Sequence, residues 1–166
     1  FITRITLDFL RDMDISYTLV KRKNDKSYNN RDAIKYAQKK NMMMDAINQL
    51  KEGKKLFIFY PYCKGNKQNH SMKDFQSLLE EHSGKKGISH NSETSDKTKK
   101  KLKDVNSTWD KYDIVISNNV IAVGVNFDIS HFDQCFLFIA PFNEMRDIVQ
   151  FSYRPRKIND NLIKFC

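Results

Sequence analysis

Short, uninterrupted apolar runs constrain the fold of this chain more than any other feature. Three of them are KLFIFY at residues 55–60, YDIVIS at 112–117 and QCFLFIA at 134–140. A strand that is apolar at every position is buried on both faces, as in parallel sheets covered by helices. Pro61 ends the first run because proline has no N–H to give to a sheet ladder. Four phenylalanines at alternating positions are expected in the core: Phe57, Phe59, Phe136 and Phe138.

Three weaker segments also have strand character. ISYTLV at residues 15–20 is rich in β-branched and aromatic residues, KGISH at 86–90 is short, and LIKFC at 162–166 ends the chain. Such content favours a pleated, half-buried conformation. We therefore expect these segments to add to the sheet.

Amphipathic segments lie between the apolar runs and predict helices at residues 31–53, 71–84, 96–109 and 143–152. Asn30 can cap the first helix at Arg31, and Gly53 can end it. Ser71 with Asp74 three residues later resembles a capping box, and Gly84 marks the end of that helix. In the third, which Asp96 opens, three residues share one face: Leu102, Val105 and Trp109. In the last helix, three residues are expected to face inward: Met145, Ile148 and Val149.

The alternation of strands and helices predicts an α/β fold with three layers, in which a mostly parallel sheet is covered by helices on both faces. In such sheets the functional residues follow the carboxyl ends of the strands. This rule selects the residues after Tyr60, His90, Ser117 and Ala140.

Composition bounds the class of protein. A chain of 166 residues that is 40% apolar can build one domain with a substantial core. No apolar run approaches the roughly 20 residues that a membrane span needs, so we expect a soluble protein with no membrane partner. The odd number of cysteines (Cys63, Cys135 and Cys166), without C-x-x-C spacing, predicts free thiols in a reducing, intracellular compartment and no zinc site. The chain begins with Phe1 and stops within an expected strand, which suggests a fragment of a longer protein.

The net charge of +9 is unevenly placed. Residues 1–110 hold 23 Lys and Arg against 14 Asp and Glu, whereas residues 111–166 hold 6 of each kind. An excess of this kind favours a polyanionic partner, and nucleic acid before a membrane. A bias toward lysine that serves only solubility explains the charge equally well.

Two arginines stand close together in DIVQFSYRPR, residues 147–156, although the chain has 22 lysines and only 7 arginines. The guanidinium group is a planar fork that meets phosphate or carboxylate with two parallel hydrogen bonds, which lysine cannot do. Arg154 and Arg156 are therefore candidates for phosphate contact. The alternative is that they form surface ion pairs with Asp147 or Asp160, each worth about 1 kcal/mol or less.

Three segments together resemble the second RecA-like domain of superfamily 2 helicases. KLFIFYPYC corresponds to motif IV, YDIVISNNVIAVGVNFD to motif V, and NEMRDIVQFSYRPR to motif VI. The resemblance covers Lys54 to Lys157. It divides the chain into a helicase C-terminal domain at residues 54–166 and a strand–helix extension at residues 1–53 that packs on the same domain.

In motif V of this family, a small polar residue at a strand end touches the nucleic-acid backbone, and a glycine follows. Here Asn118 lies six residues before Gly124, with Ser117 beside it. Asn126 and Asp128 flank the position where the family places an acidic or amide residue near the ATP ribose. The resemblance thus implies a nucleotide contact at Gly124, Asn126 and Asp128.

Motif VI usually reads Q-x-x-G-R-x-x-R, and this chain reads Q-F-S-Y-R-P-R. Gln150 and Arg154 match in register, Tyr153 replaces the glycine, Arg156 comes one residue early, and Lys157 occupies the usual second arginine position. The resemblance implies that Arg154 and Arg156 sense the γ-phosphate of ATP, one of them as an arginine finger, and that Gln150 orders water or phosphate. The motif leaves open which arginine is the finger.

The pattern Q-x-x-x-R-x-R, together with VGVNFD, is most similar to the herpesvirus-type origin-binding helicases and their relatives in large DNA viruses. The resemblance implies a DNA track, single-stranded or partly duplex, with RNA as the open alternative. The residues implied to contact its backbone are Ser92, Ser117, Asn118, Lys64 and Lys67. Small polar residues also form turns at strand ends, and lysines are also common in solvated loops, so a purely structural role stays open for each of these residues.

The chain lacks a G-x-x-x-x-G-K-[ST] phosphate loop. ATP and Mg²⁺ would therefore be bound mainly by an N-terminal lobe of the same protein, and the isolated chain is not expected to hydrolyse ATP. The reading that results is the C-terminal lobe of a viral DNA helicase that acts in replication in the host cytoplasm or nucleus. Two rivals remain: an inert helicase-like docking module for nucleic acid or protein, and a basic nucleic-acid-binding domain unrelated to ATP.

Overall fold

The computed structural model describes residues 31–91, 104–121 and 125–166, all within the compact unit Arg31–Cys166. The expected strand at residues 15–20, the cap at Asn30, the helix start at Asp96 and the candidate residues Ser92 and Gly124 lie outside the described residues.

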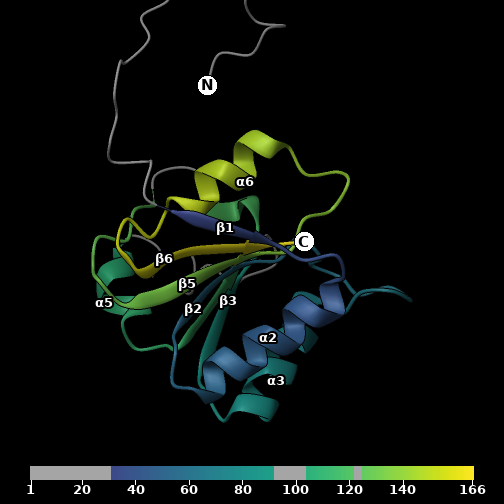
Figure 1. Cartoon of the computed structure of the whole chain (residues 1–166), viewed down its shortest axis with the longest axis horizontal. Coiled ribbons are helices and arrows are strands. Elements are labelled where there is room, and N and C mark those ends of the chain that lie inside the picture. Colours follow the sequence, from purple (N-terminus) through teal and green to yellow (C-terminus); the bar gives the residue numbers. More distant parts are fainter. Residues whose placement is uncertain (1–30, 92–103, 122–124) are drawn as a thin grey trace, which may run out of the picture. The chain divides into compact units, whose positions relative to one another are not determined.

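Within the described residues, a six-stranded sheet forms the middle layer of the domain (Figure 1). Every pairing between its strands is parallel, in the order β1-β6-β5-β2-β4-β3. The strands are β1 (Asp32–Lys35), β2 (Leu56–Phe59), β3 (Gly87–His90), β4 (Ile114–Ser117), β5 (Phe132–Leu137) and β6 (Ile158–Phe165). Because all the strands run in one direction, their carboxyl ends share one edge of the sheet and their amino ends share the other.

Helices cover both faces of this sheet, so the fold is the predicted three-layer α/β domain. The helices are α2 (Lys39–Lys51), α3 (Met72–Ser83), α5 (Val105–Trp109), the 3₁₀ turn η3 (Asn119–Ile121) and α6 (Met145–Ser152). Helices α2 and α3 lie together on one face, and α6 lies on the other (Figure 1).

Strand β2 shows why the apolar runs are continuous. Leu56 and Ile58 pack into the core beneath α2 and α3, whereas Phe57 and Phe59 pack into the second core with α5 and α6. All four side chains are completely buried. A central strand with a helix layer on each side must be apolar at every position, and the prediction of a doubly covered sheet is confirmed. The four phenylalanines expected in the core are also buried: Phe57, Phe59, Phe136 and Phe138.

Helix α3 begins and ends where its sequence predicts. The Ser71 side chain accepts a hydrogen bond from the Asp74 N–H at 3.1 Å, which satisfies an amide that has no partner within the helix. At the other end Gly84 adopts a left-handed conformation with φ of 68°, which costs glycine less than any residue with a Cβ.

The expected helix from Arg31 is wrong in its first turn. Residues 32–35 form strand β1, which pairs with β6, and α2 begins only at Lys39. All four residues of β1 are exposed, so this strand lacks the continuous apolar run by which the central strands are predicted. The inward placement of Met145 is also wrong, because its side chain is 64% exposed. Met145 is the first residue of α6, whereas Ile148 and Phe151 carry the buried stripe.

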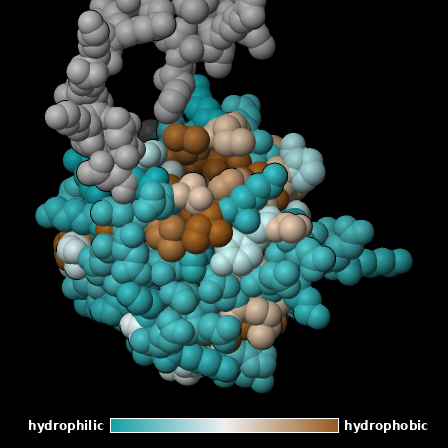
Figure 2. All heavy atoms as spheres, viewed as in Figure 1, coloured by the Kyte–Doolittle hydropathy of each residue, from teal (hydrophilic) through white to brown (hydrophobic). Residues whose placement is uncertain are grey.

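The face shown in Figure 2 is predominantly hydrophilic, with hydrophobic residues gathered over the part where α6 and β1 lie. Among the described residues, no helix is both long and apolar enough to span a membrane.

Candidate functional site

The segments that carry the two candidate motifs lie side by side. Phe127 and Pro155 form a parallel β-bridge. The Phe127 N–H donates to the Arg154 carbonyl at 2.9 Å, and the Arg156 N–H donates to the Phe127 carbonyl at 2.9 Å. Backbone pairing thus fixes the loop of Arg154 and Arg156 against residues 125–128, which come directly after Gly124.

Arg156 reaches across this bridge to both polar residues of the neighbouring segment. Its Nε lies 3.2 Å from the Asp128 Oδ1, and both side chains are more than half exposed. In the amide orientation that satisfies both of its groups, Asn126 accepts from the Arg156 Nη2 at 3.2 Å and donates to the Val125 carbonyl at 3.2 Å. Three of the predicted site residues, Asn126, Asp128 and Arg156, therefore form one exposed polar cluster.

Arg154 lies deeper than Arg156. Its Nη1 donates to the Val125 carbonyl at 3.2 Å, and its buried Nε has no hydrogen-bond partner within the described residues. Burial lowers the pKa of this guanidinium below its ordinary value. A cation held this way is stabilised by any anion that approaches it, because the local environment has already removed part of its hydration.

Gln150 lies in the last turn of α6, and its carbonyl accepts from the Tyr153 N–H at 3.3 Å. The rigid helix thus leads straight into the arginine loop. This loop follows α6 and precedes β6, so it lies at the amino edge of the sheet, opposite the edge that the general rule for parallel sheets selects.

The alternative acidic partners of the arginines have other contacts. The Asp147 carboxylate accepts from the Asn119 amide at 3.2 Å, and Asp160 forms an ion pair with Lys54 at 3.1 Å. The acidic partner found for Arg156 is Asp128.

Sequence reasoning missed Arg31. Its guanidinium group donates to the backbone carbonyls of Ser152 and Pro155, and thus holds the arginine loop from 121 or more residues away in sequence. A signal was present, because Arg31 is one of only 7 arginines in a chain that has 29 Lys and Arg in all.

At the carboxyl edge, Ser117 does not fit its predicted contact with nucleic acid. The side chain is completely buried, and its hydroxyl donates to the His90 carbonyl at 2.9 Å. The hydroxyl joins the ends of the adjacent strands β3 and β4 and presents no surface to a phosphate. Ser117 therefore has the structural role at a strand end that was the alternative to nucleic-acid contact.

Asn118 keeps a position from which it can reach a ligand. It is half-buried at the end of β4, where its Oδ1 accepts from the Val120 N–H at 3.1 Å and its Nδ2 lies 3.0 Å from the Cys63 Sγ. These contacts bring the loops after β2 and β4 together. An amide next to a soft, weakly accepting sulfur can exchange that partner for a stronger acceptor such as a phosphate oxygen.

The loop after β2 borders a surface groove of about 730 Å³. Lys64 and Lys73 bring positive charge to this groove, and Asn91, directly after β3, lines it as well. Lys67 lies on the same loop and is exposed. The carboxyl edge thus offers a polar groove with two lysines, next to Asn118 and Cys63.

The tyrosines of this loop differ in exposure. Tyr60 is buried and stacks on Phe75 with ring centroids 4.3 Å apart, so it belongs to the core. Tyr62 is half-buried and meets Phe142 edge-on at 5.9 Å, while Phe142 is 67% exposed. Within the described residues, no group of three or more His, Cys, Asp or Glu could hold a metal ion.

The sequence matches a known family over most of its length. The family model described as "Origin of replication binding protein" matches residues 1–161. A protein of Acanthamoeba polyphaga mimivirus, named as an uncharacterised helicase, R8, is 35% identical over 86 residues, which cover 50% of this chain and 8% of the relative. The replication origin-binding protein of human herpesvirus 2 is 42% identical over 43 residues, which cover 26% of this chain and 5% of the relative. The chain therefore spans a small fraction of the length of its curated relatives.

Solved structures share the fold at low sequence identity. Yeast Dbp5 L327V, solved with RNA and ADP BeF3, superposes with a TM-score of 0.64 at 11% identity, covering 99% of this chain and 42% of the other. RecG bound to a three-way DNA junction gives a TM-score of 0.56 at 18% identity, covering 97% of this chain and 21% of the other. The predicted helicase RecA-like fold is thereby confirmed.

Proposed function

The chain belongs to the origin of replication binding protein family, and on that premise we propose that it is the C-terminal lobe of an ATP-dependent viral DNA helicase. In this proposal the arginine loop completes a nucleotide site whose other half lies on an N-terminal lobe of the same protein. That lobe would supply the phosphate loop and bind ATP and Mg²⁺.

The observation that carries the proposal is the pairing of residues 125–128 with residues 153–156. The bridge between Phe127 and Pro155 brings Asn126 and Asp128 to Arg156. Side-chain oxygens that can accept from a ribose hydroxyl and a guanidinium fork that can bind a phosphate therefore share one exposed surface. In ATP hydrolysis an arginine delivered from a neighbouring domain can raise the rate by roughly 10³ to 10⁵-fold, because negative charge spreads over the γ-phosphoryl oxygens.

Of the two arginines, Arg156 suits the role of the finger better. It is exposed, and an exposed ion pair such as the one with Asp128 is easily exchanged for a phosphate. Arg154 is half-buried and already bound to the Val125 carbonyl. We assign Arg154 to shaping the pocket, with Gln150 one turn earlier ordering water or phosphate.

The carboxyl edge would hold the nucleic acid. Lys64 and Lys73 line a polar groove suited to backbone phosphates, and Asn118 lies beside it through its contact with Cys63. Nucleotide and track would then occupy different edges of the same sheet. Closure of the lobes on ATP and their release after hydrolysis would change the grip on the strand, which is how hydrolysis becomes movement.

An inert docking module is the second candidate. The presence of both arginines, with Arg156 exposed beside Asn126 and Asp128, weighs against it.

Steady-state ATPase of the full-length protein with single-stranded DNA tests the proposal. Arg156→Lys keeps the charge and removes the fork, and we expect it to lower kcat at least 10²-fold. Arg154→Lys should lower kcat by a smaller factor. Arg146→Lys, on the exposed side of α6, is the matched control and should keep the normal rate. Normal rates in both loop variants would refute the finger role and favour the docking module.

A further inference from the structure

Arg31 makes an unusual set of contacts for a residue far from any recognised motif. Its Nη1 donates to the Ser152 carbonyl, and its Nη2 donates to the Pro155 carbonyl at 2.6 Å and approaches the Arg156 carbonyl at 3.5 Å. One guanidinium group thus binds the backbone at three points of the arginine loop.

These acceptors need a partner for a structural reason. Ser152 is the last residue of α6, and the final carbonyls of a helix have no N–H partner within the helix. Pro155 stands opposite Phe127 in the bridge, but the two bridge hydrogen bonds use the Arg154 carbonyl and the Arg156 N–H, so the Pro155 carbonyl takes no part in that pairing. A planar fork with several N–H groups can satisfy both carbonyls at once, whereas the single ammonium of lysine cannot match this geometry.

Tyr153 completes the seat of this guanidinium. The Arg31 Cζ lies 4.6 Å from the centroid of the Tyr153 ring, a cation–π arrangement. Tyr153 stands where the motif VI pattern has glycine, so the departure from the pattern provides the surface on which Arg31 rests. Desolvation by burial lowers the pKa of Arg31 below its ordinary value. That agrees with a group enclosed by protein.

We propose that Arg31 is a positioning residue that holds the arginine loop in its active geometry, with Tyr153 as its stacking partner. The inference rests on the proposed function. Phe127 binds this loop from one side through two backbone hydrogen bonds, and Arg31 binds it from the other through carbonyls. Held on both sides, Arg156 has its backbone fixed while its side chain remains exposed.

Arg31 does not itself contact phosphate in this proposal. Both of its terminal nitrogens are directed at backbone carbonyls, and the residue is only partly exposed. It acts on the reaction through the positions of Arg154 and Arg156.

The full-length protein provides the test, with Arg31→Ala, Arg31→Lys and Tyr153→Leu compared by DNA-stimulated ATPase. We expect Arg31→Ala to lower kcat at least 10-fold, with the KM for ATP and the affinity for single-stranded DNA changed less than 2-fold. Guanidinium chloride at low millimolar concentration should restore part of kcat in Arg31→Ala. Arg31→Lys should resemble Arg31→Ala, and Tyr153→Leu should lower kcat by a smaller factor. Lys35→Ala, an exposed change on β1, is the control.

Hydrogen exchange supplies a readout that does not depend on activity. The Arg156 amide, which donates to the Phe127 carbonyl, should exchange at least 10-fold faster in Arg31→Ala than in the wild type and in Lys35→Ala. Unchanged exchange, or a wild-type kcat in Arg31→Ala, would overturn the proposal. If the ATPase of Arg156→Lys is normal, the proposed function fails, and faster exchange in Arg31→Ala would then still show that Arg31 holds the loop in place.

Discussion

Asp128 and Arg156 face each other across a two-residue parallel bridge, with the Asp128 Oδ1 3.2 Å from the Arg156 Nε and the side chains 53% and 58% exposed. Because water competes for both groups, this ion pair contributes about 1 kcal/mol or less to folding. Its geometry is therefore more informative about ligand binding than about stability.

Asp128→Asn is expected to leave the free energy of unfolding within about 1 kcal/mol of the wild type. In the full-length protein it should raise the KM for ATP several-fold with a smaller effect on kcat, because a carboxylate that holds a ribose hydroxyl contributes equally to the ground and transition states. ATPase kinetics with Glu81→Gln, an exposed change on α3, as control will measure this. A large fall in kcat at unchanged KM would contradict the ribose role.

Ser117→Ala and Asn118→Ala should separate a structural residue from a binding residue. Ser117→Ala removes a buried hydrogen bond to the His90 carbonyl, so it should cost about 1 kcal/mol of stability and leave DNA affinity unchanged. Asn118→Ala should weaken binding to single-stranded DNA several-fold. Fluorescence anisotropy measures the DNA affinity of both variants, with exposed Asn119→Ala as the control, and urea unfolding measures the stability of Ser117→Ala. Equal losses of affinity in Ser117→Ala and Asn118→Ala would show that strand-end packing, and not the amide, supports binding.

The core of the fold could be predicted because buried strands have a local signature. Strand β2 is apolar at all four positions, so its burial is written in consecutive residues. Strand β1 carries no such signal, because its residues are exposed and its hydrogen bonds come from β6, more than a hundred residues away in sequence. The conformation of β1 is therefore set by pairing with a distant strand, although its local sequence favours a helix.

The candidate site divides in the same way. Arg154 and Arg156 stood out by residue type and by resemblance, and the structure places Asn126 and Asp128 beside them. The burial of Ser117 depends on its neighbour β3, which spacing along the chain does not encode. Arg31 stands out by residue type, but it binds backbone carbonyls, which every residue has, so the sequence does not reveal its partners.

Cys63 offers a chemical probe of the groove at the carboxyl edge. Its Sγ lies 3.0 Å from the Asn118 Nδ2, so a strand bound there should shield the thiol. We expect single-stranded DNA to slow alkylation of Cys63 at least 5-fold, while Cys166, which is also half-buried, keeps its rate. Cys135 should stay unmodified in the folded protein, because burial raises the pKa of its thiol to about 12. Mass spectrometry of alkylated peptides measures all three, and equal protection of Cys63 and Cys166 would argue against a local site.

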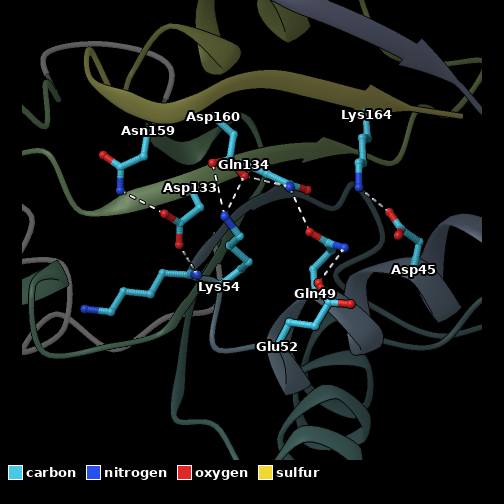
Figure 3. A network of polar contacts seen from close by, with 10 residues as sticks. Asp45, Gln49, Glu52, Lys54, Asp133, Gln134, Asn159, Asp160 and Lys164 are labelled. Atoms are coloured by element: carbon cyan, nitrogen blue, oxygen red, sulfur yellow. Dashed lines mark hydrogen bonds and ion pairs between the residues drawn. The ribbon is translucent and has the colours of Figure 1, made fainter.

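The ion pair between Lys164 and Asp45 connects β6 to α2 (Figure 3). Nζ and Oδ2 are 2.6 Å apart, and the side chains are 6% and 24% exposed. The Tyr36 hydroxyl also donates to Asp45 at 3.0 Å. Burial, together with this hydrogen bond, raises the Tyr36 pKa to about 12.

Removing the two partners of this pair should have unequal effects. Asp45→Ala leaves an ammonium group buried without its counter-ion and should cost about 3–5 kcal/mol. Lys164→Met removes the buried charge and keeps an apolar stem near the Phe136 ring, so it should cost much less. Urea unfolding of the 166-residue chain measures both. A larger loss in Lys164→Met would show that the ammonium contributes more than it costs to bury.

Asp160 should make stability depend on pH in the acid range. Gln134 donates to its Oδ2 at 2.9 Å, and Lys54 pairs with the same carboxylate (Figure 3). The Gln134 hydrogen bond, and after it the contact with Lys54, lowers the pKa of Asp160 below its ordinary 3.8. A carboxyl whose folded pKa is depressed stabilises the fold fully above its unfolded pKa, and this contribution disappears as pH falls through the folded pKa. The difference in unfolding free energy between wild type and Asp160→Asn should therefore be constant from about pH 5 to 7 and shrink below about pH 4. Gln134→Leu, which removes the main donor, should weaken that pH dependence. Urea titrations at each pH would disprove the assignment if the wild-type and Asp160→Asn curves ran parallel down to pH values where the carboxyl is protonated.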